Sequence, residues 1–506
     1  MPNVVIPIRG QTSRRVKVED VVRILSNRSK GTEEQYLVQW ACSNAPEKPP
    51  ISWHSVNELS RCLELLQDYL AIREDRKVAS SQTSSSQKRK ASELDSTPFT
   101  LTSELPSRTP SRSPSVTSAS SAPAAPAPID VYNGMLDVDQ YGFIVCRSSK
   151  YPAAQIELRR VPTPDMVRTS LRSKVDKACL RIREEYLARL AKVPGKKIHL
   201  VNTHDMSTPS LRFRYIPQYI LREGVIQAPP DTQEGCQKCS PHMGRNIGCE
   251  YTQRCGCLEY AAVNEAAITD PDMEVAYQKA KANGDSLAAF PKRFPYYAEG
   301  TKVRRAGTLV PFYLNSRRPI YECNDNCRCG PDCRNKNVQF GRTVEVEIFR
   351  TGGGRGWGLR CRENIYEGQF IDTYRGEVIT DAEATRREES ADKSKSSYLY
   401  SLDKFAESEG IDVEDLYVVD GEFYGGPTKF INHSCDPNCR QYTVSYNKHD
   451  PRVYDIAFFA CRDIPAGEEL TFDYLDKEEG EPIEDPGPDA IPCLCRAANC
   501  RKWLWT

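Results

Sequence analysis

The sequence lacks two features that would place it in or across a membrane. No apolar run approaches the roughly 20 residues that a membrane-spanning helix needs, and residues 1–10 do not show the charged-then-apolar layout of a secretion signal. We therefore exclude a membrane protein and expect no export. The chain also lacks a charge bias, because 69 Lys and Arg balance 69 Asp and Glu, so its net charge argues neither for nor against a polyanionic partner. Its 506 residues allow about three domains.

Cysteine, by contrast, is abundant, with 20 in the chain. Because no export is expected, the surroundings should be reducing, and the thiols are predicted to be free or metal-bound rather than paired in disulfides. They are also unevenly placed. Four precede residue 230, nine fall between Cys236 and Cys333, and three lie within the last fourteen residues. This clustering favours metal binding.

The part of the chain before the cysteines is predicted to hold a small module and a linker. Residues 16–72 combine strand-like apolar runs with a helical pattern over residues 59–70. Residues 73–130 are predicted to be a disordered linker, because most of this segment consists of Ser, Thr, Pro and Ala and is too poor in large apolar side chains to offset chain entropy.

Two basic features bear on location in the cell and on nucleic-acid binding. In the linker, Lys88-Arg89-Lys90 is either a nuclear import signal or a solvated basic tract. Residues 131–225, an extension ahead of the cysteines, are predicted to contain one long helix over 165–193, because apolar residues recur there three or four apart. We interpret the Arg- and Lys-rich side of that helix as a solvated face, with nucleic-acid contact as the alternative.

The nine central cysteines form two groups separated by 65 residues without cysteine. Structural zinc takes four ligands in a tetrahedron. Nine thiolates do not divide into independent four-cysteine sites, but they fill the twelve ligand places of three zinc ions if six bind once and three bridge. The segment between the groups can loop out, since closing a longer loop costs only slowly more free energy. The predicted ligands are Cys236, Cys239, Cys249, Cys255, Cys257, Cys323, Cys327, Cys329 and Cys333.

A second thiol group is predicted near the carboxyl end. Cys493, Cys495 and Cys500 are one ligand short of a tetrahedron. Cys435 would supply the fourth and pin the last residues against its own segment. Further segments each carry little information alone, since a glycine-rich loop and alternating aromatic strands are common. These segments are Arg355-Gly356-Trp357, Phe430-Ile431-Asn432-His433-Ser434-Cys435, Tyr398-Leu399-Tyr400 and Leu470-Thr471-Phe472-Asp473-Tyr474.

Together, these cysteines and segments resemble the pre-SET, SET and post-SET array of the suppressor-of-variegation class of SET-domain histone H3 lysine 9 methyltransferases, of the fungal heterochromatin type. The resemblance covers about residues 225–506. It implies a multidomain, mostly β protein in which a SET-domain fold (a β-clip with a pseudoknot) carries a pre-SET three-zinc cluster and one post-SET zinc. It implies pre-SET, SET and post-SET boundaries of 226–341, 342–475 and 476–506.

The resemblance also implies the roles of individual residues. Tyr398 and Tyr474 would line a channel for the substrate lysine, with Tyr474 carrying the catalytic hydroxyl. Phe472 would leave the amine room to rotate with methyl groups attached, which favours di- and trimethylation. We interpret residues 374–377 as a structural strand and turn. The residues implied to bind S-adenosylmethionine are Arg355, Gly356, Trp357, Tyr398, Asn432, His433 and Trp503.

Residues 16–72 are similar to a chromodomain, a module that holds methyl-lysine by cation–π contacts in a cage of three aromatic side chains. Only Trp40 of the three cage positions is aromatic here, since the others fall near Glu19 and Ser43. We therefore favour a degenerate module used for packing or protein contacts, with methyl-lysine binding as the alternative.

The resulting hypothesis is a histone H3 lysine 9 methyltransferase that acts in heterochromatin formation and gene silencing. It implies S-adenosylmethionine and zinc as cofactors, the histone H3 tail, chromatin and a heterochromatin protein complex as partners, and a location in the nucleus on the chromosome. Two alternatives stay open: a chromatin scaffold with an inactive SET domain, and a methyltransferase for another lysine.

Overall fold

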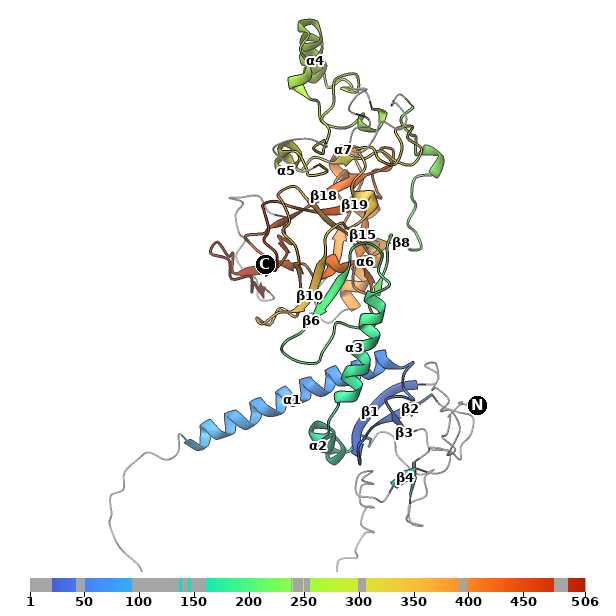
Figure 1. Cartoon of the computed structure of the whole chain (residues 1–506), viewed down its shortest axis with the longest axis vertical. Helices are drawn as coiled ribbons and strands as arrows, with labels where there is room; N and C mark the ends of the chain where they lie inside the picture. The colour runs from blue at the N-terminus through green and yellow to red at the C-terminus, as the bar shows by residue number, and fades with distance from the viewer. Residues whose placement is uncertain are drawn as a thin grey trace, which may run out of the picture. The chain divides into compact units, whose positions relative to one another are not determined.

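The computed structural model describes residues 21–41, 51–92, 136–138, 144–146, 161–237, 239, 249, 255–298, 306–390, 398–476 and 490–505. The chain divides into two compact units, Met1–Glu184 and Glu185–Thr506 (Figure 1). Strands predominate among the described elements, in agreement with the predicted mostly β class. None of the helices in the described part combines the length and the apolar character that a bilayer crossing requires.

The first unit contains a three-stranded antiparallel sheet in the order β1–β2–β3. Gly31, with φ of 63°, takes the left-handed conformation that suits the tight turn between β1 and β2. Tyr36 and Leu37 on the sheet and Leu66 on the following helix are fully buried and form its core. The elements are β1 (Val21–Lys30), β2 (Glu33–Trp40), β3 (Ile51–Ser55), α1 (Leu63–Ser92), β4 (Leu136–Val138) and β5 (Ile144–Cys146).

Helix α1 corrects the predicted start of the linker. It continues to Ser92, so residues 73–92, which the sequence assigns to a disordered segment, are helical. Residues 73–78 are rich in Arg, Glu and Lys, which have high helix propensity, and Arg73 is buried. These residues extend the helix beyond the apolar core. The rest of the predicted linker, residues 93–130, lies outside the described residues.

A break corrects the single helix predicted over residues 165–193. Helix α2 (Pro164–Arg172) ends at Ser173, whose backbone is extended, and α3 (Asp176–Leu190) begins shortly after it. Arg73 donates to three carbonyl oxygens at the end of α2, at 2.9 to 3.1 Å. Glu34 accepts from two N–H groups at the start of α3, at 2.7 and 3.2 Å. Because helix ends need partners for their unpaired backbone groups, these two side chains stabilise the break.

The second unit is built from several small sheets. Two of them have four strands, in the orders β12–β19–β18–β9 and β14–β15–β13–β8, and β10 and β11 form an antiparallel pair. The strands are β9 (Ile320–Tyr321), β10 (Val346–Arg350), β11 (Trp357–Cys361), β12 (Phe370–Tyr374), β13 (Glu377–Thr380), β14 (Leu399–Ser401), β15 (Tyr417–Asp420), β16 (Tyr424–Gly425), β18 (Cys439–Ser445), β19 (Asp455–Ala460), β21 (Ile491–Pro492) and β22 (Trp503–Trp505).

Residues ahead of the cysteines complete three of these sheets. Strand β6 (Ile198–Val201) pairs in parallel with β10, β7 (Arg214–Tyr215) with β16, and β8 (Ile220–Leu221) with β13. These short segments satisfy backbone groups at sheet edges. The carboxyl-terminal part of the predicted 131–225 extension is therefore part of the second unit's β structure.

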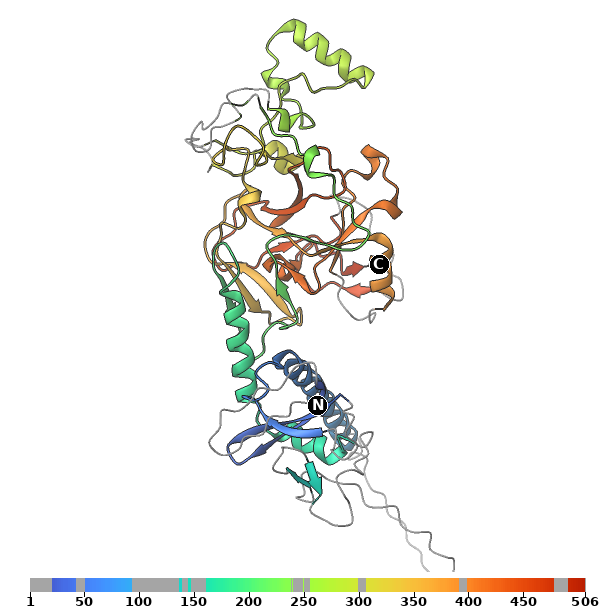
Figure 2. The same ribbon diagram turned by 90° about the vertical axis from the view of Figure 1, so that its right-hand side faces the viewer.

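The described residues of the cysteine-rich region form little regular structure. Its helices are α4 (Pro271–Asn283) and α5 (Pro311–Ser316), and in both views α4 lies apart from the sheets of this unit (Figures 1 and 2). Aromatic residues anchor the region to a core that includes Tyr296, Tyr313 and Phe459, all fully buried. The other helices of the second unit are α6 (Asp381–Ser390) and α7 (Ala406–Glu409).

Candidate active site and thiol clusters

A parallel pair of two short strands forms the centre of the candidate site. Strand β17 (Asn432–His433) pairs in parallel with β20 (Thr471–Phe472), and the N–H of Ser434 donates to the carbonyl of Phe472 at 3.0 Å. Two of the segments singled out in the sequence therefore lie side by side, although about 40 residues separate them. This arrangement places His433 next to Tyr474, with ring centroids 5.4 Å apart.

A cavity of about 530 Å³ lies against these strands. Of the residues predicted to form the site, all except Trp503 line this cavity, and the carboxyl-terminal segment contributes Leu504 instead. Trp503 lies on β22, which pairs with β21. The lining residues are Gly354, Arg355, Gly356, Trp357, Tyr374, Tyr398, Leu399, Tyr400, Thr428, Lys429, Phe430, Ile431, Asn432, His433, Phe472, Tyr474, Ile491, Pro492, Leu494, Cys495 and Leu504.

Glu469 joins the glycine-rich segment to strand β17 of this parallel pair. Its carboxylate accepts from the guanidinium of Arg355 at 3.1 and 2.7 Å and from Nδ2 of Asn432 at 2.9 Å. Asn432 also donates to the backbone oxygen of Trp357, at 3.2 Å. Both charged side chains are about three-quarters buried or more, so this pair is much less screened than a surface ion pair. The sequence analysis missed Glu469, because no spacing relates it to Arg355, 114 residues away.

His433 connects the cavity to a cysteine. Its Nδ1 accepts from the N–H of Tyr474 at 3.2 Å, and its Nε2 lies 3.3 Å from the sulfur of Cys435. Burial lowers the pKa of His433 to about 4, so its ring is neutral at physiological pH. With Nδ1 accepting, the ring proton resides on Nε2 and points toward the thiol.

Aromatic side chains form one wall of the cavity. The ring of Tyr474 lies 4.7 Å from that of Phe472, which in turn lies 4.8 Å from Phe458. The hydroxyl of Tyr474 donates to the carbonyl of Ile431 at 2.9 Å. Burial raises the pKa of Tyr474 and, in the same way, that of Tyr398. Both hydroxyls therefore stay protonated at neutral pH and can donate or accept hydrogen bonds.

Tyr374 is a second residue that the sequence analysis did not assign to the site. It was interpreted as structural, yet it lines the cavity and donates its hydroxyl to the carbonyl of Tyr398 at 2.8 Å. Its ring also lies 6.0 Å from that of Tyr400. The flanking alternation of buried residues gave no sign of this, because strand residues facing a core and strand residues facing a cavity show the same pattern.

A lysine also borders the cavity. The ammonium of Lys429 lies 4.2 Å above the ring of Tyr398 and 4.5 Å from that of Phe213, and it donates to the carbonyl of Glu422. The two rings and the carbonyl stabilise a positive charge at this position. Lys429 was likewise not singled out in the sequence.

The nine central cysteines come together in the folded chain. All are buried, and none of the described cysteines is paired in a disulfide. Four sulfurs held 2.3 Å from one zinc ion in a tetrahedron lie about 3.8 Å apart. The sulfur–sulfur distances of 3.1 to 3.7 Å are close to that separation. Groups able to hold an ion are Cys249, Cys323, Cys329 and Cys333; Cys236, Cys239 and Cys255; and Cys255, Cys257 and Cys323.

The second thiol group also assembles. Cys435, Cys493, Cys495 and Cys500 place their sulfurs within 4.8 Å of one another. Four thiols are the ligand set of a closed structural zinc site, so the residues fit that metal. The same segment is held by Arg501, which donates to both oxygens of Asp473, the neighbour of Tyr474, at 2.6 and 2.5 Å.

In the first unit, the one cage position that the structure describes is Trp40. Its side chain is buried, and its indole N–H donates to the hydroxyl of Ser52 at 2.7 Å. The neighbouring cage positions, Glu19 and Ser43, lie outside the described residues. The chromodomain likeness of this unit stays a prediction.

The parallel strand pair, the aromatic cavity and the two thiol groups define a SET-type site, and comparisons with known proteins agree. The SET domain model matches residues 356–475, and the Pre-SET motif model matches residues 191–336. The chain is 40% identical over 320 residues to the H3 lysine-9 specific histone-lysine N-methyltransferase KMT1 of Fusarium mangiferae. This alignment covers 61% of the present chain and 88% of the Fusarium protein. The chain is 39% identical over 317 residues to the H3 lysine-9 specific enzyme dim-5 of Neurospora crassa, with the same coverage.

A third relative, the H3 lysine-9 specific histone-lysine N-methyltransferase of Schizosaccharomyces pombe, is 35% identical over 331 residues, covering 64% of this chain and 58% of that protein. The chain belongs to the SET-domain histone-lysine N-methyltransferases. It is thus a lysine methyltransferase, of a class that uses S-adenosylmethionine, and its cysteine clusters are suited to zinc.

Proposed function

We propose that this chain transfers methyl groups from S-adenosylmethionine to lysine 9 of histone H3, forming di- and trimethyl-lysine. The observation that carries the proposal is that Tyr474, Tyr398 and Phe472 line the same cavity as Asn432 and His433. The matched region spans 88% of two relatives that are named as H3 lysine-9 specific enzymes, which supports the same substrate.

The cavity residues divide into two tasks. Arg355, Gly356, Trp357, Asn432 and His433 would hold S-adenosylmethionine, with Glu469 fixing Arg355 and Asn432 in place. S-adenosylmethionine supplies an electrophilic methyl group, so neither a metal nor a covalent nucleophile is needed at the reacting atoms. Zinc serves as scaffold.

The aromatic wall addresses the main obstacle, which is the charge of the substrate lysine. Its pKa of about 10.4 leaves about one amine in a thousand neutral near pH 7.4, a cost of about 4 kcal/mol. Enclosing the amine in this channel removes water from the ammonium, which lowers its pKa because the cation–π attraction of the rings replaces that hydration only in part. The protonated hydroxyl of Tyr474 can then orient the amine lone pair, and the proton can leave to water before transfer. We add Tyr374 to this wall, because it lines the same cavity.

Phe472 supports repeated methylation. Its ring is packed between Phe458 and Tyr474, and it brings no polar atom to the wall. A hydroxyl there would hold a water that crowds the amine, whereas a bare ring leaves space for an amine that already carries methyl groups.

For the metal centres we propose three zinc ions in the first thiol cluster and one in the second. The sulfur contacts support Cys249, Cys255 and Cys323 as the bridging ligands, since each approaches sulfurs of more than one group. The terminal ligands would be Cys236, Cys239, Cys257, Cys327, Cys329 and Cys333. The last three cysteines, together with Cys435, would close the C-terminal segment over the cavity, bringing Leu504 to its lining and Trp503 next to it.

We keep the domain boundaries proposed for this architecture, with pre-SET at 226–341, SET at 342–475 and post-SET at 476–506. The buried indole of Trp40 supports a packing or protein-contact role for the chromodomain-like unit rather than methyl-lysine binding. A nuclear, chromosomal location and a role in heterochromatin follow from the proposed substrate.

An inactive chromatin scaffold is less well supported, because Tyr398, Phe472 and Tyr474 are all present in the lining of one cavity, and Glu469 binds both Arg355 and Asn432 beside it. The proposal is tested by incubating the purified chain with S-adenosylmethionine and a set of histone peptides in which each lysine in turn is replaced by arginine. Loss of methylation on the lysine 9 replacement alone would support it. Unchanged labelling of that peptide would reassign the substrate, and no labelling of any peptide would favour the scaffold.

A further inference from the structure

Two buried carboxylates face each other across two neighbouring strands of the second unit. Glu377 on β13 and Asp420 on β15 are directly opposite across the two strands, and their side chains are 5% and 4% exposed. Like charges at opposed positions repel, and a buried charge without a partner is strongly destabilising. A cation placed between the two carboxylates would offset both their repulsion and the cost of burying them.

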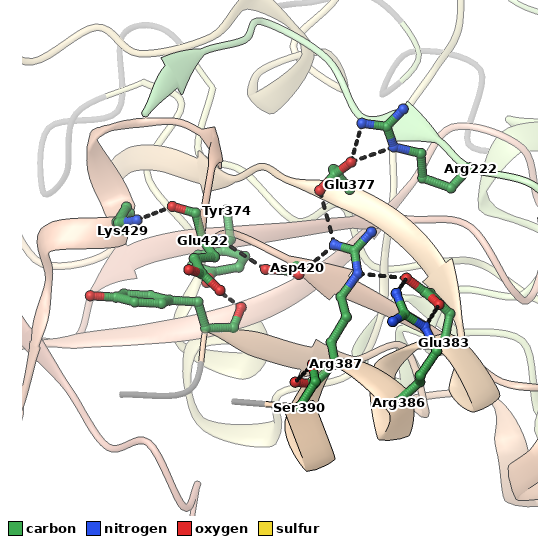
Figure 3. A network of polar contacts seen from close by, with 11 residues as sticks. Arg222, Tyr374, Glu377, Glu383, Arg386, Arg387, Ser390, Asp420, Glu422 and Lys429 are labelled. Carbon is green, nitrogen blue, oxygen red and sulfur yellow. Dashed lines mark hydrogen bonds and ion pairs between the residues drawn. The ribbon is translucent and has the colours of Figure 1, made fainter. Parts of the chain in front are cut away.

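Arg387 of α6 supplies that cation (Figure 3). It donates to Glu377 at 2.9 Å and to Asp420 at 2.6 Å, and its Nε donates to Glu383 of its own helix at 2.9 Å. Glu377 has a second partner, Arg222 of the segment after β8. Asp420 has Arg387 as its one ion-pair partner among the described residues.

The turn that follows Asp420 holds Tyr398. The other carboxylate oxygen of Asp420 accepts from the N–H of Glu422 at 2.8 Å, which fixes the turn. Within it, the N–H of Gly421 donates to the carbonyl of Tyr398 at 3.0 Å, and that same carbonyl accepts the hydroxyl of Tyr374. A Cβ at Gly421 would lie 2.4 Å from the Tyr374 hydroxyl, so the fit between turn and tyrosine is close.

We propose that Arg387 is a positioning residue for Tyr398. It does not touch the cavity. By neutralising Asp420 beside Glu377, Arg387 stabilises the turn at residues 420–422. The N–H of Gly421 in this turn then positions the backbone of Tyr398, and with it the ring that faces the substrate lysine. The predicted effect on turnover rests on the proposed function. The predicted effect on the backbone amides of the turn does not depend on it.

The test compares Arg387→Gln with Arg387→Lys and with a matched control, Arg342→Gln. Arg342 forms another buried arginine–aspartate pair, with Asp372 at 3.1 Å, that does not bond to the 420–422 turn. Hydrogen exchange of the Gly421 and Glu422 amides is measured together with kcat per folded molecule. We expect Arg387→Gln to speed exchange at both amides and to lower kcat by about tenfold, Arg387→Lys to recover most of the loss, and Arg342→Gln to change neither by more than about twofold.

The double variant Arg387→Gln with Asp420→Asn keeps the inference testable if the single variant folds poorly. The amide that replaces the carboxylate can still accept from the Glu422 N–H but carries no charge, so the double variant should lose less kcat and less protection than the single. Wild-type exchange at Gly421 in Arg387→Gln would overturn the inference, as would a loss of kcat that Arg342→Gln matches at the same fall in Tm. If the wild type methylates no peptide, the proposed function fails, whereas the exchange data still decide the role of Arg387.

Discussion

The backbone N–H of Tyr474 donates to Nδ1 of His433, so the turn after β20, which carries the candidate catalytic hydroxyl, is held by a neutral imidazole. The variant His433→Phe keeps a ring against Tyr474 but removes this acceptor. An unpaired buried N–H costs about 1–3 kcal/mol, and misplacing the hydroxyl should lower kcat by about 10- to 100-fold. Steady-state kinetics with His449→Phe as a surface control checks this, and a kcat within about twofold of wild type would contradict it.

The hydroxyl of Tyr374 should matter to turnover more than to stability. Tyr374→Phe removes one hydrogen bond, to the carbonyl of Tyr398. Tyr442→Phe is a matched control, because the Tyr442 hydroxyl also donates to a carbonyl at 2.8 Å, that of Leu314, in the core away from the cavity. Both variants should lose about 1 kcal/mol of stability. Only Tyr374→Phe is expected to lower kcat, by about tenfold, and equal activities of the two variants would show that Tyr374 is structural after all.

Product distribution should depend on Phe472. The variant Phe472→Tyr adds a hydroxyl to the wall next to Tyr474 and a site for a water molecule, which limits the space for a methylated amine. We expect the product to shift toward monomethyl-lysine. Mass spectrometry of the peptide at several time points measures this, and an unchanged ratio of mono-, di- and trimethyl-lysine would remove the role proposed for Phe472.

Activity should rise with pH. The substrate amine must lose its proton, so log kcat/KM is expected to increase with a slope near one from about pH 7 toward the lysine pKa. Burial raises the pKa of Tyr474 above its usual value near 10, so this hydroxyl stays protonated over the same range and should not cause a fall in rate below about pH 10. A descending limb between about pH 8 and pH 9 that Tyr474→Phe abolishes would argue for an ionising tyrosine instead.

Zinc content should distinguish the two thiol groups. The wild type is expected to contain about four zinc ions by elemental analysis. Cys500→Ser should lose about one, because that centre shares no ligand with the others, whereas Cys249→Ser should lose more than one, because Cys249 is a proposed bridge. Cys461→Ser, a thiol outside both groups, serves as the control. An active preparation without zinc would contradict the proposed scaffold.

The sequence by itself determined the thiol groups and most of the cavity wall. The type and the spacing of its ligands largely specify a structural metal site, and both can be read from the sequence. The nine central cysteines, and the set of Cys435 with Cys493, Cys495 and Cys500, could therefore be grouped from their positions in the sequence alone. The motif residues from Arg355 to Tyr474 followed from resemblance.

Only the tertiary structure decided what supports those residues. Glu469 reaches Arg355 across 114 residues, Arg387 reaches Asp420 from another element, and Tyr374 faces a cavity rather than a core. The break between α2 and α3 depends likewise on Arg73 and Glu34, which lie far away in the chain. Each of these side chains, including Tyr374 with its bond to the carbonyl of Tyr398, forms a hydrogen bond or ion pair between segments that no regular sequence spacing relates. Local pattern carries no information about such pairs, because they form only when folding brings the two side chains together.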